Sequence, residues 1–121
     1  MKKILLIEDE MRLHKMFEEV FKQDGVELIS AYDGALGLKA AEENYPDLII
    51  TDIVLPKKNG FEVLEAIKSN PKLAKIPVII LTNLEESKDV GKMLSLGAHT
   101  YLIKANYSVN DILKKIKEIL K

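Results

Sequence analysis

The segment KILLIED, residues 3–9, sets the pattern that decides the fold: an aliphatic run of strand length is followed directly by two acids. The segment DLIITD, residues 47–52, repeats that pattern later in the chain. Short runs rich in Ile and Val are typical of strands that a parallel sheet buries on both faces. We therefore predict five strands, at Lys3–Ile7, Val26–Ala31, Asp47–Thr51, Pro77–Leu81 and Thr100–Ile103.

Longer amphipathic segments alternate with the predicted strands. Four of them carry apolar residues at helical spacing, so that one stripe of each helix would face a core. These segments are residues 13–21, 63–67, 90–94 and 109–120. A weaker helix is expected over Ala35–Asn44, with Leu36, Leu38 and Ala41 facing inward.

Capping residues at the segment boundaries agree with this alternation. Asn59 lies three positions before Glu62, a spacing that predicts a capping box at the start of a helix. Five strand–helix units in succession indicate a parallel sheet with helices on both faces and right-handed connections. We therefore predict an α/β protein, a three-layer α/β/α sandwich of the flavodoxin-like (βα)5 kind. The pattern alone does not give the strand order, for which 2-1-3-4-5 is the usual solution.

The composition bounds the class of protein. The chain has 121 residues, the size of one domain, and 18 Lys and Arg against 19 Asp and Glu give a net charge of −1. This balance argues against nucleic-acid binding through bulk charge, and the absence of cysteine excludes disulfides and zinc–thiolate sites. No apolar run approaches the ~18–20 residues of a membrane span, and acids interrupt the apolar start too early for a signal peptide. We expect a single cytoplasmic domain over residues 1–121, with no output domain.

Polar side chains follow four of the five predicted strands. They are Glu8 and Asp9, then Asp52, Thr82 and Lys104. Ligands of open α/β sheets bind outside the carboxyl ends of the strands, so we expect these side chains to form a site. Three carboxylates in one site repel one another, which favours a bound cation, and oxygen ligands suit Mg²⁺. With an ammonium and a hydroxyl added, the set suits phosphoryl transfer, in which a carboxylate can itself be the nucleophile.

With these residues in this order, the chain resembles the receiver domain of two-component response regulators, of the chemotaxis-regulator-like kind. The resemblance covers the whole chain and extends to loop residues near the expected site. These are Pro56 and Gly60 after Asp52, and Gly97, Ala98 and Tyr101 before Lys104. Glycine-rich nucleotide-binding motifs do not occur in the sequence, so nucleotide binding is unsupported.

The resemblance implies a role for each matching residue. Asp52 would accept a phosphoryl group from a phosphohistidine, and Thr82 would hydrogen-bond the phosphoryl oxygens. Lys104 would pair with the phosphoryl group and, before phosphorylation, with Asp52. Tyr101 would be an aromatic switch that turns inward as Thr82 moves.

The resemblance also implies a Mg²⁺ cofactor, with Mn²⁺ as a possible substitute. Asp9 and Asp52 would bind the ion directly, Glu8 would bind it through water, and the backbone carbonyl of Val54 would complete the set. The protein would not be an enzyme beyond Mg²⁺-dependent self-phosphorylation and slow self-dephosphorylation.

The partners implied by the resemblance are proteins. A sensor histidine kinase or a phosphotransfer protein would supply the phosphoryl group, and an unidentified protein target would bind the output face, roughly residues 85–121. We expect no direct contact with nucleic acid or membrane, and a monomer or weak dimer. The alternative is a pseudo-receiver, a protein-interaction module that acts without phosphorylation.

Several residues depart from the family pattern. Ala105 replaces the usual proline after the lysine, and a cis bond before a non-proline residue costs ~2.5–4 kcal/mol, so we predict a trans Lys104–Ala105 bond. Asn83 is larger than the usual residue after the threonine and would narrow access for phosphate. Val54 and Leu84 are aliphatic and cannot orient a hydrolytic water, which predicts slow self-dephosphorylation.

Two histidines complete the set of candidate residues. Both His14 and His99 are expected to lie outside the site with their side chains exposed to solvent.

Overall fold

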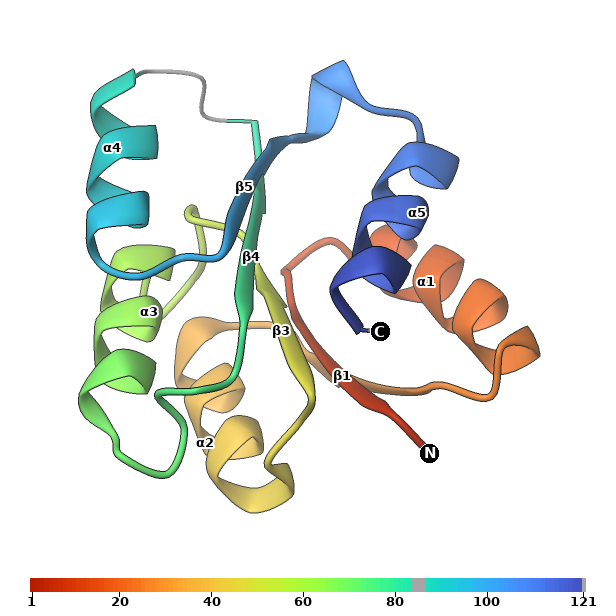
Figure 1. The fold of residues 1–121 in the computed structure, drawn as a ribbon, viewed down its shortest axis with the longest axis horizontal. Helices are drawn as coiled ribbons and strands as arrows, with labels where there is room; N and C mark the ends of the chain where they lie inside the picture. Colours follow the sequence, from red (N-terminus) through yellow and green to blue (C-terminus); the bar gives the residue numbers. More distant parts are fainter. Residues whose placement is uncertain (84–86, 121) are drawn as a thin grey trace.

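The computed structural model describes residues 1–83 and 87–120, which form a parallel sheet between two layers of helices (Figure 1). The strands are β1 (Lys3–Ile7), β2 (Glu27–Ala31), β3 (Leu48–Thr51), β4 (Val78–Thr82) and β5 (Thr100–Ile103). The helices are α1 (Met11–Gln23), α2 (Gly34–Asn44), α3 (Gly60–Ser69), α4 (Ser87–Ser95) and α5 (Val109–Leu120). A 3-10 turn, η1 (Lys104–Asn106), follows β5. The sheet order is β2-β1-β3-β4-β5, so the predicted fold class and strand order are confirmed.

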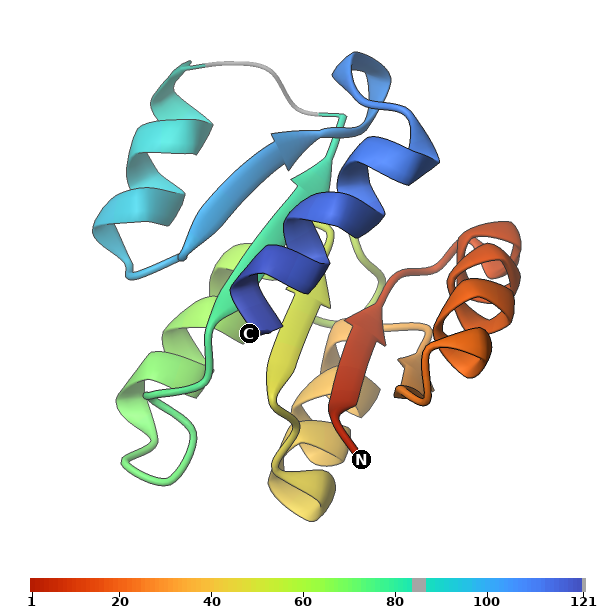
Figure 2. The ribbon, with the colours of Figure 1, turned by 45° about the vertical axis from the view of Figure 1, so that its right-hand side comes forward.

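Each face of the sheet carries its own apolar core. Helices α2, α3 and α4 cover one face, and α1 and α5 cover the other (Figures 1 and 2). Successive residues of β1 point to opposite faces, as strand geometry requires. Leu5 and Ile7 therefore join the core under α2 and α3, whereas Ile4 and Leu6 join the core under α1 and α5. This double burial explains why the strands are almost entirely aliphatic.

Local signals fix where the helices begin. The Asp33 carboxylate accepts a hydrogen bond from the Leu36 backbone N–H at 2.8 Å and caps α2. Asn59 and Glu62 form the predicted capping box at the start of α3. These caps satisfy backbone N–H groups that have no partner within the helix.

Two inward-facing predictions are wrong. Leu36 is 51% exposed, because the buried stripe of α2 runs through Gly37 and Ala41. In α4, the predicted apolar stripe within residues 90–94 is Val90, Met93 and Leu94, but Met93 is fully buried whereas Leu94 is exposed. Short helices with few apolar residues leave the position of the stripe poorly determined by the sequence.

The strand register places the site. Ile7 at the end of β1 pairs with Thr51 at the end of β3, and Thr82 at the end of β4 pairs with Ile103 at the end of β5. The residues that follow these strands therefore leave the sheet at one edge. Within the described ranges, no helix is long and apolar enough to cross a membrane.

Candidate functional site

An ammonium joins two carboxylates at the carboxyl edge of the sheet. The Lys104 Nζ lies 2.9 Å from Glu8 Oε2 and 2.9 Å from Asp52 Oδ2. The side chain of Glu8 is 3% exposed, that of Asp52 is 11% exposed, and that of Lys104 is 18% exposed. The three groups come from the ends of β1, β3 and β5, so the fold brings together residues far apart in the sequence. The expected pairing of Lys104 with Asp52 is present.

Burial shapes the protonation of this cluster. It raises the pKa of Glu8 to about 7, with the nearby Asp52 charge adding to the effect and Lys104 opposing it. Burial alone would lower the pKa of Lys104, but its hydrogen bonds to the two carboxylates outweigh that cost and the pKa is raised. Lys104 is therefore a fixed positive charge near neutral pH, and Glu8 is the group that titrates there.

Asp52 opens into a cavity of about 240 Å³ that it shares with Val54, Thr82 and Asn83. Its Oδ1 accepts the backbone N–H of Ile53 at 2.6 Å, which fixes the carboxylate at the cavity wall. Thr82 is the last residue of β4 and is buried, whereas Val54 is 65% exposed at the cavity mouth. The predicted acceptor and the predicted hydroxyl therefore line one space large enough for a phosphoryl group.

Asp9 does not join the cluster. It is exposed, and within residues 1–83 and 87–120 no three His, Cys, Asp or Glu side chains are grouped closely enough to hold a metal ion. Glu8 and Asp52 turn toward Lys104 instead, so the ammonium supplies the positive charge that we expected from a cation. The donor chemistry still fits Mg²⁺, because Glu8, Asp9 and Asp52 offer carboxylate oxygens, the ligand type that this ion prefers.

The loop after Asp52 explains the glycine of the resemblance. A Cβ at Gly60 would overlap the carbonyl oxygen of Asp52, and the Gly60 N–H donates to the Ile53 carbonyl at 2.8 Å. Only glycine lets α3 begin this close to the acceptor. On the other side of the site, the Lys104–Ala105 bond is trans, as predicted, and starts the η1 turn.

Tyr101 lies on β5, half-buried against the core under α2, α3 and α4. Burial raises the pKa of its phenol, and the charges of Asp89 and Asp52 add to the shift. Its predicted role as a switch stays a prediction. Leu84 and positions 85, 86 and 121 of the expected output face lie outside the described residues.

The prediction for one histidine is wrong. His99 is exposed as expected, but His14 is only 2% exposed. It lies on the buried stripe of α1 with Phe17 and Phe21, three and seven positions later. Its Nε2 lies 2.6 Å from the backbone carbonyl oxygen of Glu8. The i, i+3, i+7 spacing with two phenylalanines was the signal that could have identified it.

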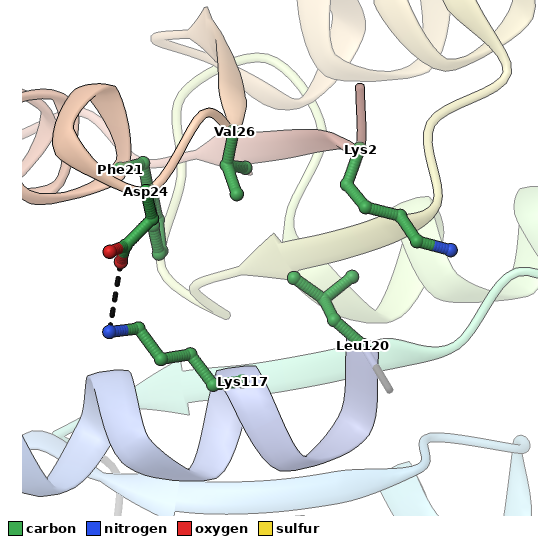
Figure 3. A pocket seen from close by; sticks show the side chains of 6 residues that line it. All are labelled: Lys2, Phe21, Asp24, Val26, Lys117 and Leu120. Atoms are coloured by element: carbon green, nitrogen blue, oxygen red, sulfur yellow. Dashed lines mark ion pairs between the residues drawn. The ribbon is translucent and has the colours of Figure 1, made fainter.

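A larger hollow lies at the opposite edge of the sheet, where the parallel strands begin. Its volume is about 290 Å³, and it is lined by Lys2, Phe21, Asp24, Val26, Lys117 and Leu120 (Figure 3). Asp24 and Lys117 form an exposed ion pair across it at 2.9 Å. It contains none of the residues that the sequence identified as candidates for chemistry.

The fold and the polar edge together define a flavodoxin-like α/β domain with an acid–lysine site. The chain belongs to the response regulator receiver domain family, which matches residues 4–117. It is 38% identical over 120 residues to the transcriptional regulatory protein CiaR of Streptococcus pneumoniae, covering 98% of this chain and 51% of CiaR. The chain spans about half the length of the curated relatives that it matches.

Solved structures agree with this assignment. The Mn²⁺-bound form of response regulator Rcp1 is 36% identical, with a TM-score of 0.83 over 98% of this chain and 91% of that one. The non-phosphorylated HemR receiver domain from Leptospira biflexa is 25% identical, with a TM-score of 0.90 over 100% and 95% of the two chains. The resemblance seen in the sequence is therefore confirmed at the level of family and fold.

Proposed function

We propose that the chain is a phosphorylation-controlled switch whose phosphoryl acceptor is Asp52. The observation that carries the proposal is the position of the Asp52 carboxylate, 2.9 Å from Lys104 Nζ and in one cavity with Thr82. The phosphoryl donor would be the phosphohistidine of a sensor histidine kinase or a phosphotransfer protein. Beyond self-phosphorylation and self-dephosphorylation, the chain would not act as an enzyme.

In the transfer step, a carboxylate oxygen of Asp52 forms a bond to phosphorus as the phosphorus–nitrogen bond of the donor breaks. Charge on the transferring oxygens would be stabilised by the Lys104 ammonium, which is paired with Asp52, and by the hydroxyl of Thr82, which lines the cavity. Glu8 shares Lys104 with Asp52, so the lysine keeps one carboxylate partner when it turns to the new phosphoryl group.

Mg²⁺ would be held by Asp9 and Asp52 directly, by Glu8 through water and by the backbone carbonyl of Val54. Bound there, it would neutralise part of the charge on the incoming phosphoryl oxygens. Rcp1, a relative of this chain, has been solved with Mn²⁺, which supports Mn²⁺ as a substitute.

Phosphorylation would be transmitted through Thr82 and Tyr101 to the α4–β5–α5 face, where a protein target binds. Thr82 is buried and pairs with Ile103 of β5, two residues beyond Tyr101, so a shift at Thr82 would reach the strand that carries Tyr101.

The Val54 side chain offers no polar group to orient a water at the cavity mouth, so we expect slow self-dephosphorylation. We also propose that the chain binds its protein partners directly, that it is a monomer or a weak dimer, and that it works in the cytoplasm.

The experiment is the intact mass after incubation with acetyl phosphate and Mg²⁺, with Asp52→Asn in parallel. One added phosphoryl group in the parent, absent with EDTA and absent in the variant, is the expected result. If no condition adds mass, the pseudo-receiver function replaces this one, and Ala105 and Asn83 become the residues to revert first.

A further inference from the structure

A buried histidine touches the site but has no part in the function proposed above. His14 lies on α1, and its Nε2 is 2.6 Å from the carbonyl oxygen of Glu8. Its Nδ1 is 2.8 Å from the Ser30 hydroxyl on β2, and its ring centroid is 4.4 Å from that of Tyr32. The ring is thus held on both nitrogens and against one aromatic neighbour.

The chemistry of the partners fixes the tautomer of this ring. A carbonyl oxygen can only accept, so Nε2 carries the proton that is donated to Glu8. Nδ1 of the neutral ring then accepts from the Ser30 hydroxyl. Burial lowers the pKa of His14, which agrees with a neutral ring. Ser30 therefore orients His14, and His14 in turn donates to a carbonyl one residue beyond the end of β1.

The carbonyl in question belongs to the peptide that joins the two acids. The plane of the Glu8–Asp9 peptide sets the direction in which the chain leaves β1 and thereby where each acid side chain starts. Glu8 points inward to Lys104, whereas Asp9 is exposed, so a rotation of this peptide would move both acids relative to Asp52. Ligand-orienting partners outside the metal's own ligands commonly change metal affinity 10–100-fold when removed.

We propose that His14 is a positioning residue that holds the Glu8–Asp9 peptide in the orientation that the acidic site needs to bind a divalent cation. This inference rests on the proposed function, since it concerns the same site. It assigns a role to α1 and to Ser30 that neither the sequence pattern nor the family resemblance supplied.

The test compares His14→Leu, which cannot donate, with His14→Gln, whose amide can. Mg²⁺ affinity is measured by calorimetry, and the Mg²⁺ concentration for half-maximal phosphorylation by acetyl phosphate is measured alongside. We expect about a tenfold loss of Mg²⁺ affinity in His14→Leu, a substantial recovery in His14→Gln and a smaller loss in Ser30→Ala. Phe17→Leu is the matched control, because Phe17 is buried on the same helix and its phenyl ring cannot donate a hydrogen bond to the Glu8 carbonyl.

A purely structural role would lower the melting temperature of His14→Leu and Phe17→Leu alike and leave Mg²⁺ affinity unchanged in both. That result would overturn the inference. A second readout needs no metal: the carbonyl ¹³C shift of Glu8 should move in His14→Leu and return in His14→Gln, and an unmoved shift would also overturn it. Failure of the parent to bind Mg²⁺ or take up phosphate counts against the proposed function instead, and the carbonyl shift still decides whether His14 holds the peptide.

Discussion

The two edges of the sheet carry ion pairs of equal length in different surroundings. At the carboxyl edge, Lys104 lies 2.9 Å from each of two carboxylates, and all three side chains are at most 18% exposed. At the opposite edge, Lys117 lies 2.9 Å from Asp24, but these side chains are 53% and 36% exposed (Figure 3). The N–O distances of the two sets of ion pairs are equal, so only the exposed fractions of their side chains distinguish them.

The difference teaches which edge can do chemistry. Exposed pairs are screened by water and contribute ~0–1 kcal/mol, so Asp24 and Lys117 are free to exchange partners at little cost. Buried charges depend on each other because removing one leaves the others without compensation. A new charge at the carboxyl edge, such as a cation or a phosphoryl group, should therefore change how Lys104, Glu8 and Asp52 pair. A new charge at the opposite edge should have little effect.

The largest expected effect comes from removing the shared cation. Lys104→Met leaves the buried carboxylates of Glu8 and Asp52 facing each other, and should lower the free energy of unfolding by about 3 kcal/mol at pH 7. Urea denaturation without Mg²⁺ measures this change. A loss below about 1 kcal/mol would show that the cluster behaves like a surface pair.

The next effect is a pH dependence that arises from Glu8. Its pKa is about 7 in the folded protein against 4.5 for the free side chain, so the folded state holds an extra proton between these values. Stability of the parent relative to Glu8→Gln should therefore fall as pH rises from about 4.5 to 7, by at most ~1.4 kcal/mol per pH unit. Urea denaturation across this window measures the slope, and a difference that stays flat or rises would contradict it.

His14 acts in the opposite sense in the same range. Burial lowers its pKa below 6.5, so the unfolded state takes up a proton first as the pH falls, and stability is lost below about pH 6.5. Comparing the parent with Glu8→Gln cancels this contribution, because both proteins retain His14.

A smaller effect is expected from Mg²⁺. At ten times its dissociation constant, the ion should stabilise the parent by about 1.4 kcal/mol, and Asp52→Asn, which lacks one predicted ligand, by clearly less. Thermal unfolding with Mg²⁺ and with EDTA measures both proteins. Equal stabilisation of the two would place the ion away from Asp52.

The smallest effect belongs to the opposite edge. Lys117→Met removes the exposed pair with Asp24 and should change the free energy of unfolding by less than about 0.5 kcal/mol, with no further change at high salt. It is the matched control for Lys104→Met, since both substitutions replace a lysine in a 2.9 Å pair. Equal effects of the two substitutions would remove the distinction between the edges.

The sequence predicted the fold well where patterns are local and repeated. Aliphatic runs located the strands, and the Asn59–Glu62 capping box located the start of α3. The carboxyl-edge residues Asp52, Thr82 and Lys104 were predicted as neighbours because parallel strands end at one edge.

What the sequence could not give is the direction of individual side chains. Glu8 and Asp9 are adjacent and chemically alike, yet one is buried on Lys104 and the other is exposed. That choice depends on the Glu8–Asp9 peptide and on two partners distant in sequence, Lys104 from η1 and His14 from α1. The prediction that His14 is exposed to solvent is wrong for the same reason. A polar residue on an apolar stripe can be recognised as buried only when its hydrogen-bond partners are known, and these are Ser30 and the Glu8 carbonyl.

The central claim is that the carboxyl edge responds to a phosphoryl group at Asp52. The most direct test is a set of backbone amide NMR spectra recorded with Mg²⁺ before and after addition of beryllofluoride, a phosphoryl mimic. We predict large shifts at Asp52, Thr82 and Lys104, and unchanged positions for Lys2 and Val26, which lie at the opposite edge and outside the α4–β5–α5 face. Spectra that do not change at the carboxyl edge, or that change equally at both edges, would contradict the claim.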